Sequence, residues 1–165
     1  MAGSAMTMPV EISEVTSADL AEWVGLALQL WPPEKGESDS QAKLEMEAEL
    51  AGILRSARDT GLLVRDSEGR AIAFMNLSLC DEYVPGATQF PVAYVEGIYV
   101  VDEARHTGVG AALMARGEAW ARAKGCKELA SDVVIDNEAS QKFHTRVGFE
   151  EVERVVFFIK DVETP

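Results

Sequence analysis

The sequence predicts a mixed α/β domain built around a central sheet, and three observations lead to this fold class. The chain has 165 residues, 47% hydrophobic and 26% charged, which suits one globular domain with a substantial core. Stretches of period-two alternation and of helical period follow one another in the order β-α-α-β-β-β-α-β-α-β. We find no repeat, low-complexity stretch or linker, so we expect a single domain over residues 1–165.

The first half of the chain shows clear helix and turn signals. Thr16 and Asp19 have capping-box spacing ahead of apolar residues at helical period, and Pro32 and Pro33 end that helix. The Glu-rich helix that follows is typical of a solvated helix face. The predicted elements here are a strand at 9–15, helices at 16–31 and 39–58, and a hairpin at 61–84.

The second half alternates strands with helices. Its first strand is apolar almost throughout, as expected of a central strand. Gly148 closes the last helix, and Glu153 then alternates with Val152 and Val155 as in a final strand. The predicted elements are strands at 92–101, 127–135 and 149–160 and helices at 104–125 and 137–148.

The charge balance excludes some partners. The 15 basic and 28 acidic residues give a net charge of -13, spread along the chain. Binding to nucleic acid or to an anionic membrane needs a basic face, so neither is expected, whereas a cationic substrate fits. No apolar run approaches the roughly 18 residues of a membrane span, and the first ten residues do not resemble a signal peptide, so we expect a cytoplasmic protein.

The stretch Arg105-His106-Thr107-Gly108-Val109-Gly110 stands out because it places a basic, glycine-containing turn before a helix. Such a turn can gather backbone N–H groups around an anion. It is not a nucleotide-hydrolysing phosphate loop, because Ala111 and Ala112 replace the required Lys-Ser/Thr pair. It is not a dinucleotide fingerprint, because Leu113 occupies the place of the third glycine.

The remaining pattern, R-x-x-G-x-G between a strand and a helix, resembles the GNAT superfamily of acetyl-CoA-dependent N-acetyltransferases. The flanking segments "VEGIYVVDEAR" and "NEASQKFHTRVGF" resemble the same family, so the similarity covers residues 92–149. It implies a GNAT-type central mixed, mostly antiparallel sheet flanked by helices, acetyl-CoA as co-substrate and no metal. The implied coenzyme-binding residues are Ile98, Val100, Arg105, His106, Thr107, Gly108, Val109, Gly110 and Asn137.

A more specific resemblance, to the aminoglycoside 6'-N-acetyltransferases, extends over almost the whole chain. It is carried by "LQLWP", "DEYVPG", "FPVAYVEGIYV", "GCKELASD" and "GFEEVERVVFF". Two features differ: Pro85 stands where the family usually has Asn, and "DVVIDNEAS" departs in its first half. The resemblance implies that Trp31, Tyr83, Glu96, Asp132 and Glu153 border the substrate site, with Glu96 helping to deprotonate the amine.

Each of these residues also has a structural interpretation. Glu96 interrupts an apolar strand, where a carboxylate is costly unless it is paired or solvated, and this favours a role in a site. Asp132 could be a turn residue at a strand end, and Glu153 could simply face solvent. Tyr83 and Trp31 could be core or hairpin aromatics. The resemblance supports all five together.

His144 lies where many GNAT members carry a tyrosine that protonates the departing thiolate. A histidine can do this near neutral pH, although a lone His in a short helix can also be structural. In the implied reaction the amine loses a proton, through water, to Glu96. Backbone N–H groups around Ile98 and Tyr99 then stabilise the oxyanion.

The resemblance implies an aminoglycoside 6'-N-acetyltransferase that acts in antibiotic resistance. Two alternatives stay open: an acetyltransferase for polyamines or for protein N-termini or lysines, and a non-catalytic acyl-CoA-binding regulator. Glu96 and Asp132 argue against the regulator, because neither is needed to hold coenzyme A. The resemblance also implies a possible homodimer formed through the C-terminal strands.

Overall fold

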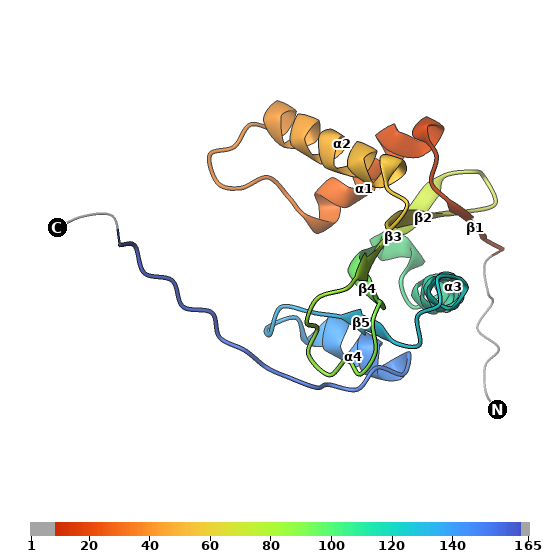
Figure 1. Ribbon diagram of the computed structural model, residues 1–165. Helices are drawn as coiled ribbons and strands as arrows, with labels where there is room; N and C mark the ends of the chain where they lie inside the picture. The colour runs from red at the N-terminus through yellow and green to blue at the C-terminus, as the bar shows by residue number, and fades with distance from the viewer. Residues whose placement is uncertain (1–8, 163–165) are drawn as a thin grey trace. The chain divides into compact units, whose positions relative to one another are not determined.

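The structure is a computed structural model and describes residues 9–162 (Figure 1). The chain forms two compact units, Met1–Asp132 and Val133–Pro165. The first unit contains the sheet and three helices, and the second contains α4 (Glu138–Arg146) and the segment 149–162. The expectation of one domain stays a prediction.

The first unit is built on a five-stranded sheet in the order β1-β2-β3-β4-β5. All neighbouring strands are antiparallel except β4 and β5, which are parallel. The mixed, mostly antiparallel sheet predicted from the sequence is thereby confirmed. The strands are β1 (Glu11–Glu14), β2 (Thr60–Arg65), β3 (Ala71–Cys80), β4 (Val92–Val100) and β5 (Leu129–Ser131).

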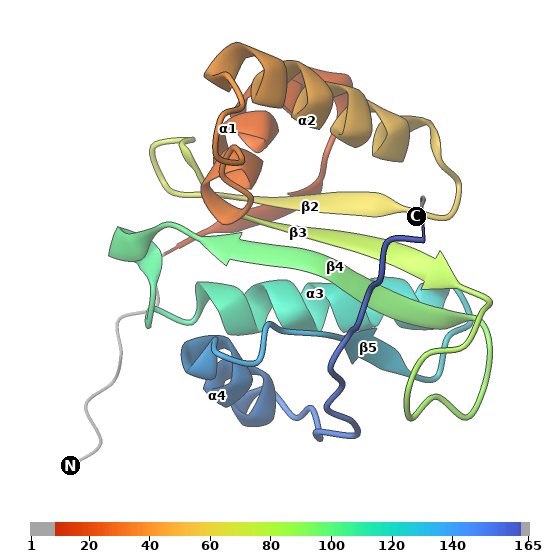
Figure 2. The same ribbon diagram turned by 90° about the vertical axis from the view of Figure 1, so that its left-hand side faces the viewer.

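Helices cover both faces of this sheet (Figure 2). Side chains alternate between the faces of a strand, so neighbouring residues of β3 serve different helices. Phe74 and Asn76 face α1 and α2, whereas Met75 and Leu77 lie under α3, close to its Gly117. Within the described residues, no helix is both long enough and apolar enough to span a bilayer. The helices are α1 (Leu20–Leu30), α2 (Asp39–Arg55) and α3 (Val109–Ala123), with short 3-10 turns at Ser17–Asp19 and Asp102–Ala104.

The start of the first helical segment confirms the predicted capping box. The backbone N–H and the hydroxyl of Thr16 each donate to Asp19, both at 2.8 Å. Arg65 of β2 forms ion pairs with Asp19 and Glu22, also at 2.8 Å. The Arg65 hydrogen bond, reinforced by Thr16, holds the pKa of Asp19 below its usual value, so this carboxylate stays ionised.

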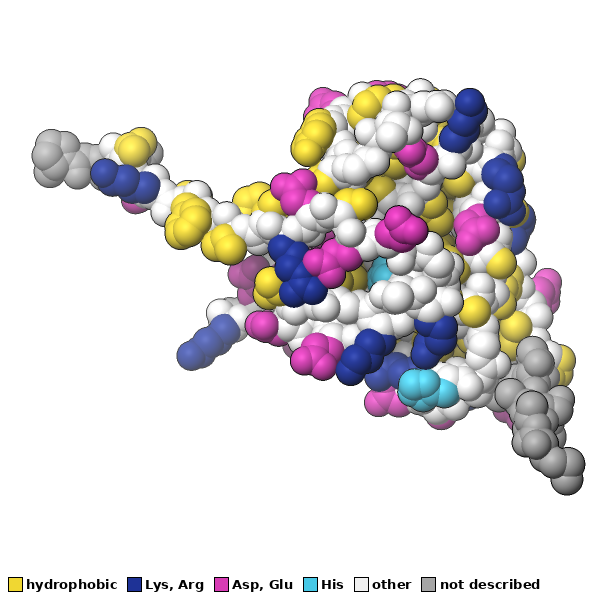
Figure 3. Space-filling view, turned by 90° about the horizontal axis from the view of Figure 1, so that it is seen from below, with side chains coloured by type: hydrophobic (Ala, Val, Ile, Leu, Met, Phe, Trp, Pro, Cys, Tyr) yellow, Lys and Arg dark blue, Asp and Glu magenta, His cyan; other side chains and the backbone are white. Residues whose placement is uncertain are grey.

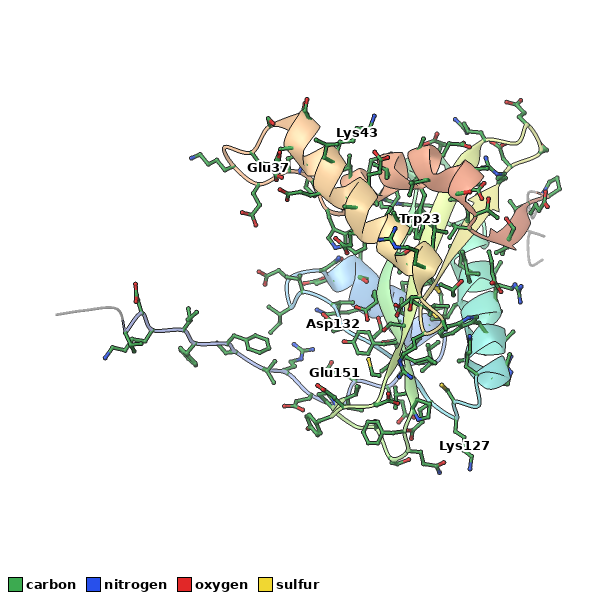
Figure 4. All side chains as sticks on the ribbon, turned by 45° about the horizontal axis from the view of Figure 1, so that its top comes forward. Trp23, Glu37, Lys43, Lys127, Asp132 and Glu151 are labelled. Carbon is green, nitrogen blue, oxygen red and sulfur yellow. The ribbon has the colours of Figure 1, made fainter. Side chains whose placement is uncertain are left out.

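One buried polar contact fastens α1 to the sheet. The indole N–H of Trp23, which is labelled in Figure 4, donates to the side-chain oxygen of Asn76 at 3.0 Å, and both residues are buried. A buried amide without a partner would be costly, so this bond fixes where α1 lies along β3. Leu50 of α2 and Leu63 of β2 belong to the same core.

The predicted strand at 149–160 is wrong. Residues 149–162 form neither helix nor strand, and all but Phe149 are exposed. Figure 3 shows hydrophobic side chains standing out along this segment; Phe157 and Phe158 are each 92% exposed. Period-two alternation predicts an extended backbone, but a strand also needs hydrogen bonds from a neighbour, which no sequence pattern within the segment supplies. The strand predicted at 127–135 likewise shortens to the part that pairs with β4.

Candidate functional site

A β-bulge in β4 creates the centre of the candidate site. Asn76 pairs with Gly97 and Leu77 pairs with Val95, so Glu96 is an extra residue that has no opposite residue in the β3–β4 ladder. Because of this insertion, Glu96 and Gly97 both face the α1 side, although successive residues normally alternate. The Ser78 hydroxyl donates to Glu96, whereas a Cβ on Gly97 would overlap the indole of Trp31.

An open pocket of about 360 Å³ lies over the bulge. Trp31, just after α1, forms part of its wall, and its ring packs on Phe74 with centroids 5.9 Å apart. The pocket is therefore bounded by α2, by Trp31 after the end of α1, by β3 and β4, and by the segment that joins α2 to β2. Its lining residues are Trp31, Glu49, Ile53, Asp59, Asn76, Leu77, Ser78 and Glu96.

Asp132 and Glu96 occupy equivalent places on neighbouring strands. The parallel ladder ends where Val95 pairs with Ser131, so Glu96 and Asp132 are the first residues beyond it (Figure 4 marks Asp132). From there on β4 has no strand partner on its β5 side in the described chain. Ile98 and Val100 lie on this part of β4, beyond the last residue that pairs with β5.

A tyrosine missed by the sequence analysis holds Asp132. The hydroxyl of Tyr94, on β4, donates to Asp132 Oδ1 at 2.6 Å. Burial, reinforced by this hydrogen bond, raises the pKa of Tyr94 well above its ordinary value, so the phenol keeps its proton. Tyr94 pairs with Ala130, two residues before Asp132. The period-two rule thus accounts for the contact once the strand register is known.

Some acidic residues of the described chain form ion pairs with basic residues, and the carboxylates of this region do not. Asp19, Glu22 and many others form ion pairs with arginines or lysines. Within residues 9–162, Glu96 and Asp132 have no ion-pair partner, and the same holds for Glu49 and Asp59 in the pocket. The pocket and its border therefore carry negative charge that no cationic side chain compensates.

Tyr83 lies in the loop between β3 and β4 and is 80% exposed. The loop is fastened at both ends. Arg58 forms an ion pair with Asp81 at one end, and at the other Glu128 accepts hydrogen bonds from the backbone N–H (2.8 Å) and hydroxyl (2.6 Å) of Thr88. The structure places Tyr83 on an anchored loop and does not bring it into the pocket.

The turn before α3 has the geometry of an anion site. His106 (φ 61°) and Gly108 (φ 92°) adopt left-handed backbone conformations, which bring the chain round to the first turn of the helix. Arg105 donates to the Val100 carbonyl at 3.0 Å, and the Thr107 hydroxyl donates to a carbonyl within the turn. These side chains shape the turn, and the N–H groups at the N-terminus of α3, near Val109 and Gly110, can bind an anion.

Asn137, His144 and Glu153 lie in the second unit. The Asn137 side chain caps α4 by accepting from the Ser140 N–H at 3.0 Å. His144 is buried, with Nδ1 2.8 Å from the Ser140 carbonyl oxygen and its ring 5.1 Å from that of Phe149. Glu153 lies in the exposed segment 149–162.

The structure thus brings Trp31 and Glu96 into one pocket and connects Asp132 to Glu96 through the β4–β5 register. The sequence analysis missed Ser78 and Tyr94, because strand register and not spacing brings them to these carboxylates. The Glu-rich face of α2 is exposed, as the sequence predicted, and one of its residues, Glu49, also lines the open pocket. No group of three or more His, Cys, Asp or Glu side chains in the described chain could hold a metal ion.

Comparison with known proteins identifies related sequences. The model of the acetyltransferase (GNAT) family matches residues 21–149. The chain is 40% identical over 142 residues to an aminoglycoside N(6')-acetyltransferase type 1 of Serratia marcescens, covering 86% of this chain and 92% of that protein. A protein of the same name from Acinetobacter genomosp. 13 is 37% identical over 93% of this chain and 99% of its own length.

Several solved structures are similar to this one. The aminoglycoside 6'-N-acetyltransferase AAC(6')-Ih of Acinetobacter baumannii superposes with a TM-score of 0.83 at 33% identity, covering 93% of this chain and 99% of that one. AAC(6')-Iy in complex with the bisubstrate analogue CoA-S-monomethyl-acetylneamine gives 0.81 at 37% identity, with the same coverage. A ribosomal-protein-alanine N-acetyltransferase of Brucella melitensis, at 18% identity and a TM-score of 0.69, shares the fold.

The close approach of Trp31 to Gly97 leads to a prediction. Gly97→Ala places a methyl group inside the space of the indole ring, so the ring must move out of the pocket wall. We expect a red-shifted, more quenchable tryptophan emission and a loss of about 1–3 kcal/mol in the free energy of unfolding. Gly25→Ala, on α1 where a Cβ meets nothing, is the control and should leave the emission unchanged. Identical spectra for Gly97→Ala and the unmodified protein would show that Trp31 does not rest on this glycine.

Proposed function

The chain belongs to the GNAT acetyltransferase family, and from this premise we propose that it is an aminoglycoside 6'-N-acetyltransferase acting in antibiotic resistance. It transfers the acetyl group of acetyl-CoA to the 6'-amine of the antibiotic. The observation that carries the proposal is the pair Glu96 and Asp132, which have no cationic partner in the described chain and flank the end of the β4–β5 ladder. The names of the relatives supply the class of substrate.

The acidic pocket suits a polycationic substrate. A net charge of -13 attracts an aminoglycoside over long range, and the carboxylates can then bind its ammonium groups by charge-assisted hydrogen bonds. We assign Trp31, Glu96 and Asp132 to the substrate site, with Trp31 as an apolar wall for a sugar ring. Tyr83 and Glu153 are proposed to border the same substrate from exposed segments.

The turn at the start of α3 is assigned to the coenzyme. Its N–H groups, near Gly108, Val109 and Gly110, would bind the pyrophosphate of acetyl-CoA. The part of β4 beyond its last pair with β5 would give the rest of the coenzyme backbone partners. The full proposed set is Ile98, Val100, Arg105, His106, Thr107, Gly108, Val109, Gly110 and Asn137.

The reaction begins when the bound 6'-ammonium gives up a proton, through water, to Glu96. The free amine attacks the thioester carbonyl carbon, and the negative oxygen that forms is stabilised by backbone N–H groups of β4 around Ile98 and Tyr99. The nitrogen of this intermediate gives up its extra proton to water, the C–S bond breaks to leave the amide, and the thiolate of coenzyme A takes up a proton. We assign His144 as the donor of that proton.

The extent and location of the enzyme are also proposals. The family match crosses the boundary between the two units at residue 132, which supports one GNAT domain over residues 1–165. We infer a cytoplasmic enzyme, because acetyl-CoA is a metabolite of that compartment. Cell fractionation would test this, and activity found mainly outside the cytoplasmic fraction would contradict it.

The coenzyme assignment predicts a loss of ligand stabilisation. Acetyl-CoA binding only the folded enzyme should raise its Tm, and Gly110→Val should abolish that rise, because a β-branched side chain blocks the approach of the pyrophosphate. Gly52→Val, in the last turn of α2, where a Cβ meets nothing, also introduces a β-branched residue into a helix, but away from the turn, and should keep the full shift. A full shift in Gly110→Val would place the coenzyme elsewhere.

The substrate assignment predicts which nitrogen reacts. Thiol release from acetyl-CoA should be rapid with an aminoglycoside that has a 6'-amine and close to background with an otherwise similar 6'-hydroxyl compound, because a neutral hydroxyl gains little from the carboxylates and is a poor nucleophile. NMR of the product should place the acetyl group on the 6'-nitrogen. Equal turnover of the 6'-hydroxyl analogue contradicts the assignment. Turnover of peptides or polyamines alone assigns a different amine substrate, and binding of acetyl-CoA without turnover of any amine indicates a regulator.

The pH dependence of this assay separates the proposed proton-transfer groups. The rate should rise with pH as the bound ammonium becomes easier to deprotonate. Glu96→Gln should flatten the rise and lower kcat by about 100-fold or more. His144→Gln should lower kcat about tenfold or more, with the rise retained. If His144→Gln leaves kcat intact, His144 serves only the packing against Phe149.

We further infer a homodimer in which residues 149–162 of one copy pair with a second copy. The segment exposes five consecutive apolar side chains at residues 155–159 and has no strand partner in the described chain. Light scattering should give twice the mass of the chain, and Ile159→Glu should restore a monomer by burying a charge in the interface. Leu44→Glu changes an exposed leucine of α2 and should remain dimeric. A monomeric wild-type protein at micromolar concentration contradicts the inference.

A further inference from the structure

The two carboxylates at the end of the β4–β5 ladder each accept a hydrogen bond from a different hydroxyl group. Glu96 and Asp132 follow the last parallel pair on adjacent strands, where like charges repel. The Ser78 hydroxyl bonds to Glu96 from the β3 side, and the Tyr94 hydroxyl bonds to Asp132. Each carboxylate is therefore attached to a different donor, and neither donor carries a charge.

The kind of donor matters for binding a cation. An arginine at this place would fix Asp132 equally well but would also neutralise it, as Arg65 does for Asp19 and Glu22. A phenol leaves the negative charge available and still restricts the side chain to one orientation. Burial and the hydrogen bond to Asp132 raise the pKa of Tyr94, which favours the protonated phenol that donates in this contact. A carboxylate that is already oriented loses less conformational entropy when a ligand binds.

We propose that Tyr94 is a positioning residue of the substrate site, which holds the Asp132 carboxylate ready for one ammonium group of the aminoglycoside. The proposal rests on the function proposed above. Tyr94 does not take part in the acetyl transfer, and its hydroxyl need not touch the substrate. It acts by keeping Asp132 beside Glu96 in a fixed orientation, so that the two carboxylates receive the substrate from defined directions.

The test is the kinetics of Tyr94→Phe, which removes one oxygen atom and keeps the ring. We expect the KM for an aminoglycoside with a 6'-amine to rise about tenfold, the effect of losing a hydrogen bond to a charged group, with kcat changed less than about threefold. The KM for acetyl-CoA should stay the same. Retention of the acetyl-CoA thermal shift shows that the variant is folded.

A double-mutant cycle connects the effect to Asp132. In an Asp132→Asn background, Tyr94→Phe should change the KM less than about twofold, because the acceptor it positions is already altered. Glu118→Gln removes one exposed carboxylate of α3, which pairs with Arg122, and serves as the matched control. In that background the full rise of about tenfold should remain.

Asp132→Glu gives a second, independent measure. It keeps the negative charge but moves the carboxylate by one methylene away from the Tyr94 hydroxyl, and its KM should rise as much as that of Tyr94→Phe. An unchanged KM in Tyr94→Phe or in Asp132→Glu overturns the positioning role. So does a rise in KM from Tyr94→Phe that is equally large in the wild-type and the Asp132→Asn backgrounds. If the unmodified enzyme turns over no aminoglycoside, the proposed function itself fails, and this inference fails with it.

Discussion

The site depends on one constraint, the β-bulge in β4, in which Glu96 is the extra residue. In a regular ladder Glu96 and Gly97 would face opposite sides of the sheet, and only one of them could meet the α1 face. The bulge turns both to that face, so one position provides a carboxylate and the next provides room for the Trp31 indole. The buried hydrogen bond between Trp23 and Asn76 fixes α1 over the bulge, because Asn76 is the pairing partner of Gly97. The pocket, its Trp31 wall and the Glu96 carboxylate are therefore all positioned by the same β3–β4 register.

The treatment of charge differs between the scaffold and the site. Scaffold carboxylates such as Asp19 and Glu22 are joined to Arg65, which lowers their pKa values and ties the first helical segment to β2. At the site the hydrogen-bond donors are the hydroxyl groups of Ser78 and Tyr94 and not guanidinium groups. Glu96 and Asp132 are therefore oriented without being neutralised. A protein with 28 acidic and 15 basic residues cannot pair every acid, and the unpaired ones gather in part where a polycation would bind.

Sequence reasoning located most secondary structure because the signals were local. The Thr16–Asp19 capping box, the two prolines after Trp31 and the left-handed Gly108 before α3 depend only on residues a few positions apart. The prediction of a final strand was wrong for the opposite reason. Its alternation can be read within the segment, but the hydrogen-bond partner that a strand needs lies elsewhere. Tyr94 and Ser78 were missed on the same grounds, since a neighbouring strand presents them to the carboxylates and nothing within their own segments marks them.

The sequence by itself determined the fold class, the family resemblance and the types of residue that the chemistry needs, because hydrophobic period, capping residues and a glycine-containing turn are all written within short windows. Only the tertiary structure decided which of those residues meet. It placed Trp31 and Glu96 in one pocket, set Asp132 beside Glu96 at the end of a parallel ladder, and left Tyr83 exposed on an anchored loop. The physical reason is that strand register is set by pairing across the whole sheet, and a shift of one residue moves every side chain to the other face.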